Sequence, residues 1–261
     1  MNDPRVEPDW IAARLDDPSV RVVEVDVSPA AYDSGHIPGA LLWNAYGDLR
    51  HPDYTLVDDD ALADLLERSG ISNRTTVVFY GYAAHLGYWL MTSRGHDDVR
   101  LLDGPRERWT GRWAAEAPAH PRATYSLSPA GRLEATREDV LRGDAVIVDV
   151  RSQLEYEGER FWPSGAPESV GRAGRIPGSV HVPIEAFRTP DGSYRSLSEM
   201  QDAVTAAGVT PAAPAVVYCT IGNRAAQAWF AFTHLLGHRD VSVYYGSWAE
   251  WGMRADTAVE S

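Results

Sequence analysis

Residues 215–224 read Ala-Val-Val-Tyr-Cys-Thr-Ile-Gly-Asn-Arg, and they place Cys219, the single cysteine of the chain, directly after an apolar run. The run Ala215-Val-Val-Tyr218 is typical of a short buried strand. The segment from Arg224 to Gly237 shows helical periodicity and ends at a glycine, which is typical of an amphipathic helix. The six residues from Cys219 to Arg224 are therefore predicted to form a loop between a strand and a helix.

The apolar run before the cysteine also occurs earlier in the chain, as Val77-Val-Phe-Tyr80. Four further segments recur in the same order at nearly the same spacing. They are Ile37-Pro38-Gly39 and Ile176-Pro177-Gly178, 63–70 and 201–208, Gly95-His96 and Gly237-His238, and Trp109 and Trp251. A period of roughly 140 residues is far too long for a solenoid, so the sequence predicts a duplicated domain.

The segment 117–129 between the two copies contains three prolines and little apolar periodicity, which is typical of a linker. We therefore expect a first domain at 1–117, a linker at 118–129 and a second domain at 130–261. Within each copy, β-branched runs alternate with helical segments. This alternation predicts an α/β fold, in which each domain is a mostly parallel sheet with helices on both faces. In such sheets, chemistry takes place at the carboxyl ends of the strands.

Composition limits the classes of partner. The chain has 261 residues, 24 basic and 37 acidic, and a formal net charge of −13, which argues against nucleic acid or an anionic membrane as a main partner. No apolar run reaches the ~18 residues of a membrane span, and residues 1–8 do not resemble a signal peptide. We therefore expect a cytoplasmic protein. One cysteine excludes an internal disulfide framework and a multi-cysteine metal site, and no metal or other cofactor is expected.

The two copies differ most at the predicted loop. The first copy has no cysteine there, and it is four residues shorter between Tyr80 and Gly95 than the second copy is between Tyr218 and Gly237. The second copy also carries extra residues near 158–173. We expect function to lie where the copies diverge, because the shared parts suffice to build the fold.

The predicted surroundings of Cys219 favour a reactive thiol. Backbone N–H groups of a strand-to-helix loop can converge on one point, and the helix dipole adds positive potential there, so a thiolate is stabilised. Gly222 allows the positive φ that a tightly curved loop needs. Arg224 adds a positive charge for an anionic group. The alternative is an inert cysteine that closes a buried strand.

The ordered set of motifs resembles the rhodanese family of sulfurtransferases in its tandem two-domain form. The matching segments are Tyr32-Asp-Ser-Gly-His-Ile-Pro-Gly39, Asp149-Val-Arg151, Gly174-Arg-Ile-Pro-Gly178, Cys219-Thr-Ile-Gly-Asn-Arg224 and Tyr245-Gly-Ser-Trp-Ala-Glu-Trp-Gly252. The resemblance implies that Cys219 takes the outer sulfur of a small anionic donor and forms a persulfide. The sulfur then passes to a thiophilic acceptor, which is cyanide, a thiol or a thiol-bearing protein. It also implies that the first domain is inactive.

The resemblance further implies a set of residues around the sulfur. Thr220, Ile221, Gly222, Asn223 and Arg224 would form the cradle for the anion. Ser247 would lie near this loop and hydrogen-bond to it. Arg151 would either hold the donor or form an ion pair at the strand end, and Arg175 would either face the site or lie exposed on a turn.

The residues after the cysteine bear on the donor. Family members specialised for thiosulfate often have basic residues there, and those specialised for 3-mercaptopyruvate often have Gly-Ser; Thr220-Ile221 matches neither pattern. Because Ile221 cannot donate the hydrogen bond of that serine and Arg224 is basic, we expect thiosulfate as the donor. The alternatives are 3-mercaptopyruvate as the donor, or a persulfide carrier that a partner desulfurase loads.

A cysteine phosphatase or arsenate reductase is a further alternative. Those enzymes need five residues between the cysteine and the arginine of the loop, which gives room for a tetrahedral oxyanion. Cys219 and Arg224 are separated by four residues. The smaller loop favours a single sulfur atom.

Overall fold

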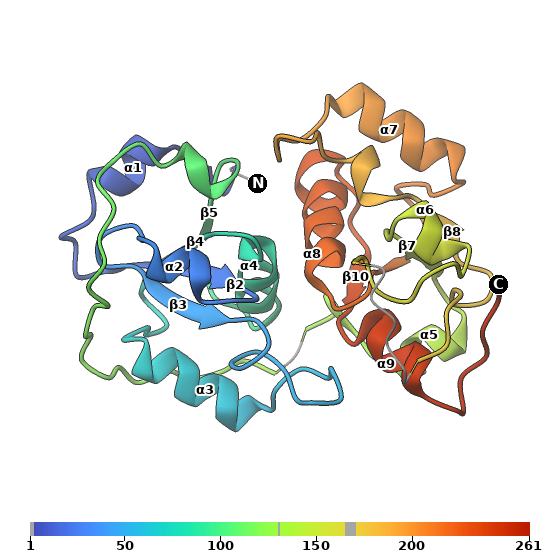
Figure 1. Ribbon diagram of the computed structural model, residues 1–261, viewed down its shortest axis with the longest axis horizontal. Coiled ribbons are helices and arrows are strands. Elements are labelled where there is room, and N and C mark those ends of the chain that lie inside the picture. The colour runs from blue at the N-terminus through green and yellow to red at the C-terminus, as the bar shows by residue number, and fades with distance from the viewer. Residues whose placement is uncertain (1–2, 130, 165–170) are drawn as a thin grey trace. The chain divides into compact units, whose positions relative to one another are not determined.

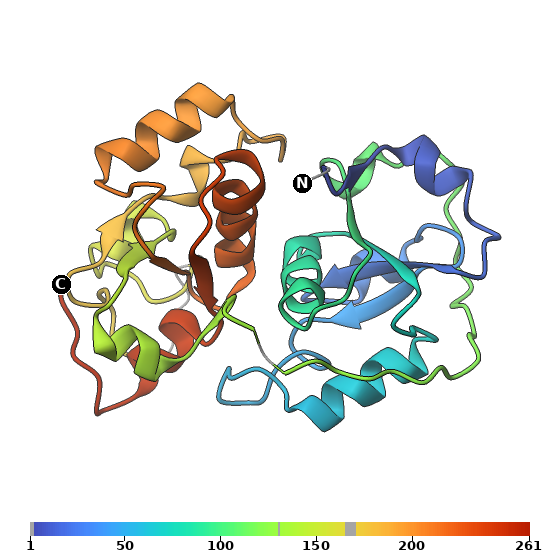
Figure 2. The same ribbon diagram turned by 180° about the vertical axis from the view of Figure 1, so that it is seen from behind.

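The computed structural model describes residues 3–129, 131–164 and 171–261. The chain forms two compact units, Met1–His51 with Leu56–Gly131 and Pro52–Thr55 with Arg132–Ser261. Within the described residues, each unit has a five-stranded parallel sheet with helices around it (Figures 1 and 2). The predicted α/β class is confirmed. None of the helices in these ranges is both long and apolar enough to span a lipid bilayer.

The first unit has the sheet order β1-β5-β4-β2-β3, and all its strand pairs are parallel. The strands are β1 (Arg5–Val6), β2 (Val20–Asp26), β3 (Leu41–Asn44), β4 (Thr76–Tyr80) and β5 (Val99–Leu102). The helices are α1 (Pro8–Ala12), α2 (Ala30–Asp33), α3 (Asp59–Arg68), α4 (Ala84–Ser93) and the short 3-10 helix η1 (Arg106–Arg108). Helix α3 begins where the side chain of Asp58 accepts a hydrogen bond from the amide of Ala61, and Asp59 and Asp60 lie in its first turn.

The second unit repeats this arrangement with the order β6-β10-β9-β7-β8, again all parallel. Its strands are β6 (Glu134–Ala135), β7 (Val146–Asp149), β8 (Val180–His181), β9 (Ala215–Tyr218) and β10 (Val241–Tyr244). Its helices are α5 (Arg137–Arg142), α6 (Gln153–Tyr156), α7 (Leu197–Ala206), α8 (Asn223–Phe230) and α9 (Ser247–Met253), with a 3-10 turn at Ile184–Ala186. The identical strand order in both units confirms the duplication.

An equivalent hydrogen bond holds the Ile-Pro-Gly motif in both copies. In the second unit the amide of Ile176 donates to the hydroxyl of Tyr218, at the end of the central strand β9, over 3.2 Å. In the first unit the amide of Ile37 donates to the hydroxyl of Tyr80, at the end of β4, over 3.1 Å. Both tyrosines are buried, so this bond satisfies a buried hydroxyl and holds the motif on the sheet.

Two segments of the second unit need comment, because one differs from the predicted helix and the other is only partly described. The helix expected from 224 to 237 is α-helical only to Phe230 and continues as a π-helical turn, Ala231–Leu235, in which each bond spans one more residue. The extra segment near 158–173 falls partly outside the described residues.

The expected linker contacts the first unit. Within 118–129 the chain has no helix or strand, and it follows α3, the helix near the bottom of both views (Figures 1 and 2). Arg122 pairs with Asp64 and Glu67 of α3, both at 2.8 Å, and the hydroxyl of Tyr125 lies 2.9 Å from Nδ1 of His96. The boundaries at 117 and 130 stay predictions.

Candidate functional site

The loop Cys219–Gly222 joins β9 to α8, at the position that the sequence predicts. Gly222 has φ +87°, and a Cβ atom on it would lie 3.1 Å from the carbonyl oxygen of Tyr245. Glycine is therefore required there both for the backbone conformation and for the close approach of a second segment. Ile221 packs against the hydrophobic core of the second unit, and Asn223 is the first residue of α8.

The sulfur of Cys219 is buried and faces a backbone donor. The residue is 1% exposed, and the amide of Gly222 donates to its Sγ atom over 3.1 Å. Helix α8 begins one residue later, so the positive end of its dipole lies next to the loop. The amide of Gly222 and the helix dipole together place positive potential at the sulfur, and the same arrangement suits the outer sulfur of a persulfide.

A second helix holds the loop from its other side. The amide of Cys219 donates to Oγ of Ser247 over 3.1 Å, and this hydroxyl donates to the carbonyl of Tyr244 over 2.8 Å. The amides of Trp248 and Ala249, in the first turn of α9, donate to the carbonyls of Cys219 and Thr220, both over 2.9 Å. The expected hydrogen bond between Ser247 and the loop is therefore present, with Ser247 as the acceptor. That Ser247 has a positive φ of 52° could not be read from the sequence.

Glu155 of α6 is a site residue that sequence reasoning missed. It is fully buried, and its carboxylate accepts hydrogen bonds from the hydroxyl of Thr220 at 2.6 Å, from two nitrogens of Arg224, both at 2.8 Å, and from the amide and hydroxyl of Ser152. Burial alone would raise the pKa of Glu155. The hydrogen bonds and positive charge of Arg224, together with the hydrogen bonds of Thr220 and Ser152, instead lower this pKa to about 2. The carboxylate is therefore ionised at neutral pH.

The structure places Arg224 against this carboxylate. Its guanidinium binds Glu155 through two nitrogens, donates to Oγ1 of Thr220 over 2.6 Å, and is 17% exposed. Burial opposes its charge, but the hydrogen bonds to Glu155 and the charges of Cys219 and Glu155 raise the pKa of Arg224 above its ordinary value. Its predicted contact with an anionic donor stays a prediction.

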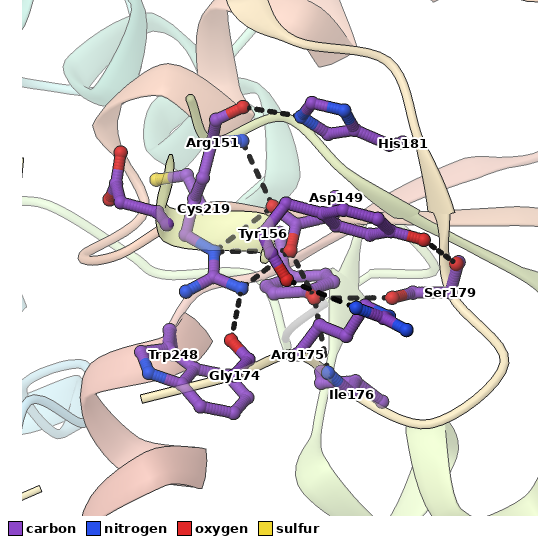
Figure 3. Close-up of polar contacts among 12 residues, drawn as sticks. Asp149, Arg151, Tyr156, Gly174, Arg175, Ile176, Ser179, His181, Cys219 and Trp248 are labelled. Atoms are coloured by element: carbon purple, nitrogen blue, oxygen red, sulfur yellow. Dashed lines mark hydrogen bonds and ion pairs between the residues drawn. The ribbon is translucent and has the colours of Figure 1, made fainter. Parts of the chain in front are cut away.

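Arg151 follows β7, the strand that pairs with β9, and is completely buried (Figure 3). Its guanidinium pairs with Asp149 at 2.6 Å, donates to the carbonyl of Gly174 at 2.8 Å, and stacks over the ring of Trp248 with 4.6 Å between the guanidinium carbon and the ring centre. Burial would lower the pKa of Arg151, but Asp149 raises it. Of the two expected roles, the structure shows the ion pair at the strand end.

Arg175 is not on an exposed turn but packed against the ring of Tyr156, with its guanidinium paired to Glu260. It also donates to the carbonyl of Tyr156 over 3.3 Å (Figure 3). Arg151, Arg175 and Arg224 are therefore each paired with a carboxylate, so the charges cancel pair by pair. The ion pair of Arg151 was one of its two expected roles, whereas sequence reasoning missed the partners of Arg224 and Arg175 because Glu155 and Glu260 are distant from them in the chain.

The comparison with known families decides the identity of the two units. The family model described as Rhodanese-like domain matches the chain twice, at residues 7–112 and 133–254. This chain belongs to the rhodanese family. It is a rhodanese-type sulfurtransferase with two tandem domains, as its motifs predict.

Curated relatives cover nearly the whole of this rhodanese. The sulfur carrier protein TtuD of Thermus thermophilus is 39% identical over 95% of this chain and 93% of its own length. A protein of Haloferax volcanii named "Putative thiosulfate sulfurtransferase" is 37% identical over 99% of this chain and 96% of its own length. A protein of Mycolicibacterium smegmatis with the same name is 35% identical over 99% of this chain and 98% of its own length.

Two solved structures match the fold over nearly the whole of this rhodanese. An anaerobic ergothioneine biosynthesis enzyme from Chlorobium limicola, solved with trimethyl histidine, has a TM-score of 0.87 and 25% identity over 99% of this rhodanese and 70% of that chain. A variant of EanB described as a cysteine persulfide in a tetrahedral intermediate state has a TM-score of 0.85 at 25% identity, with the same coverage.

The first rhodanese domain has a shorter turn without a cysteine at the equivalent strand end. At the end of β4 the chain reads Gly81-Tyr-Ala, and Gly81 has φ +99°. The turn leads directly into α4, so no thiol stands at this strand end. All cysteine chemistry of this rhodanese therefore belongs to the second domain.

Proposed function

We propose that this rhodanese moves a sulfane sulfur from thiosulfate, through a persulfide on Cys219, to a thiophilic acceptor such as cyanide or a thiol. The observation that carries the proposal is the hydrogen bond from the amide of Gly222 to Sγ of Cys219, in a loop that opens helix α8. Preorganised backbone donors stabilise negative sulfur without having to reorganise during the reaction. They serve the thiolate before transfer and the persulfide after it.

The chemistry consists of two displacements. In the first, the thiolate of Cys219 attacks the outer sulfur of thiosulfate, the sulfur–sulfur bond breaks, and sulfite leaves with the electron pair. In the second, cyanide or a thiolate attacks the outer sulfur of the persulfide, and the thiolate of Cys219 leaves. With cyanide the product is thiocyanate. No external oxidant or reductant is needed, and the enzyme alternates between two covalent states, which is ping-pong catalysis.

Two observations support thiosulfate over 3-mercaptopyruvate. Relatives with 35–37% identity over 99% of this chain bear the name "Putative thiosulfate sulfurtransferase". The hydroxyl of Thr220, which follows the nucleophile, donates to Glu155 and accepts from Arg224, so it is already engaged. It therefore does not replace the serine that is typical of mercaptopyruvate-specific members.

The test is a side-by-side measurement of kcat/KM for thiosulfate and for 3-mercaptopyruvate, with cyanide as acceptor and thiocyanate as the measured product. We expect the larger value for thiosulfate, and we expect Cys219→Ser to form no thiocyanate from either donor. A larger kcat/KM for 3-mercaptopyruvate would contradict the proposed donor. Thiocyanate formation by the serine variant would contradict the proposed nucleophile.

A sulfur carrier is the second candidate, because the Thermus relative with 39% identity is named as one. The same loop would then receive sulfur from a partner desulfurase and hand it to a thiol-bearing protein. Turnover separates the two functions. Steady thiocyanate production over many cycles supports the enzyme, and one stoichiometric transfer followed by a stable persulfide supports the carrier.

A further inference from the structure

Both ends of the cysteine loop are bound to one buried carboxylate. Thr220 directly follows the nucleophile, and Arg224 lies in the first turn of α8; both donate to Glu155, and Arg224 also donates to Thr220. The three side chains form a closed ring of hydrogen bonds that spans the loop. The segment between its two ends carries the Gly222 amide that faces Sγ of Cys219.

The carboxylate of Glu155 is also held by the start of its own helix. Ser152, the N-cap of α6, donates to Glu155 from its amide at 3.1 Å and from its hydroxyl at 2.7 Å, in a capping box. The carboxylate thus accepts five hydrogen bonds, two on one oxygen and three on the other. The start of α6 therefore holds the carboxylate independently of its three hydrogen bonds to Thr220 and Arg224.

The same contacts remove the free charge of Arg224. The bidentate pair brings a full negative charge against the guanidinium, and the carboxylate is buried while the guanidinium is largely so. A dianionic donor at Cys219 therefore meets a neutral pair, and the amide of Gly222 is the backbone donor shown at the sulfur.

We propose that Glu155 is a positioning residue for sulfur transfer, which holds the loop around Cys219 and also cancels the charge of Arg224 toward the donor. This inference rests on the proposed persulfide transfer through Cys219. Glu155 touches neither sulfur nor donor in this role. It acts through Thr220 and Arg224.

The experiment measures single-turnover sulfur loading of Cys219 by thiosulfate, followed by mass spectrometry. It gives a maximal loading rate and a half-saturating thiosulfate concentration. In Glu155→Gln the loop loses its anchor and the charge of Arg224 is released. We expect the maximal rate to fall at least about tenfold, because small displacements of reacting groups are costly. We expect the half-saturating concentration to fall roughly threefold, because the dianion is now attracted.

Two further variants fix the sign of the charge effect. Arg224→Met leaves the carboxylate without its partner, so the half-saturating concentration should rise. The double variant Glu155→Gln/Arg224→Met restores neutrality, so this concentration should return to the wild-type value while the maximal rate stays low. A loop that is merely loosened would raise the half-saturating concentration in all three variants, which would overturn the proposal.

Glu199→Gln is the matched control. Glu199 is also the third residue of a capping box, with Ser196, and lies 3.5 Å from a nitrogen of Arg195, but it belongs to α7 and does not touch the loop. Glu199→Gln changes the net charge by the same amount as Glu155→Gln does. Both loading parameters should stay at the wild-type values, whereas a change equal to that of Glu155→Gln would overturn the proposal.

Thr220→Val keeps the inference testable if Glu155→Gln does not fold. It removes one anchor and leaves both charges, so the maximal rate should fall while the half-saturating concentration is unchanged. An unchanged maximal rate would overturn the positioning role. If wild-type protein takes up no sulfur from thiosulfate, the proposed function fails instead. The two failures are therefore distinguishable.

Discussion

The backbone amide of Gly222 lies 3.1 Å from Sγ of Cys219, three residues earlier in the chain. The contact exists because the chain turns back on itself within one loop, and the turn requires the positive φ of Gly222. A sulfur atom in this position meets an N–H donor and the start of a helix. The nucleophile and the group that stabilises its charge are thus set by the same short stretch of sequence.

Gly222→Ala should damage both stability and sulfur transfer. The new Cβ would sit in a left-handed conformation and 3.1 Å from the carbonyl of Tyr245, so we expect a loss of about 1 kcal/mol or more in the free energy of unfolding. The control is Gly208→Ala at the end of α7, where φ is +77° and a Cβ meets nothing within 4 Å. It should lose about 1 kcal/mol or less and keep its kcat. Urea unfolding gives the free energy of unfolding and the thiocyanate assay gives kcat. Equal kcat values for the two variants would refute the role of this turn.

Substitutions of Ser247 should separate backbone strain from the loss of a hydrogen bond. Ser247→Ala removes the acceptor of the buried Cys219 amide and keeps the unfavourable φ, so we expect a loss of about 1–2 kcal/mol in the free energy of unfolding. Ser247→Gly loses the same acceptor but relieves φ, so it should be the more stable of the two. Both should lose sulfur transfer to a similar extent. Greater stability of the alanine variant would show that φ is not strained.

The ionisation of Glu155 should make stability depend on acid pH. Its pKa is lowered from 4.5 to about 2 in the folded protein, so its ionised form stabilises the fold fully above the unfolded pKa. This stabilisation disappears as the pH falls from about 5 through 2, and its full value is roughly 3 kcal/mol. The difference in unfolding free energy between wild type and Glu155→Gln should therefore shrink over this range. A difference that stays constant between pH 6 and pH 3 would contradict the assigned ion pair.

Much of the fold could be predicted from the sequence, because the decisive signals are local or repeated. The apolar run before Cys219, the glycine-ended helices and the Ile-Pro-Gly motif in both copies predict two parallel α/β units. Gly222 could also be predicted as a turn residue from its local sequence, because a tight loop leaves few residue types that fit its backbone.

The partners of Glu155 and Arg175 could not be predicted from the sequence. Glu155 lies more than 60 residues before Thr220 and Arg224, and no local pattern connects a capping box of α6 with a loop after β9. Glu260, which pairs with Arg175, lies 85 residues after it in the chain. Such pairs follow from how strands and helices are packed, and arginines that look like an anion site in one dimension become ion pairs in three.

The most direct test of sulfur transfer through Cys219 is the mass of the intact protein after incubation with thiosulfate. The wild-type chain should gain about 32 Da, one sulfur atom on its reactive thiolate, and should lose it on addition of cyanide with release of thiocyanate. Cys219→Ser should gain nothing while it keeps the wild-type Tm. No gain of mass in the wild type, or a cyanide-labile gain in the serine variant, would contradict the account.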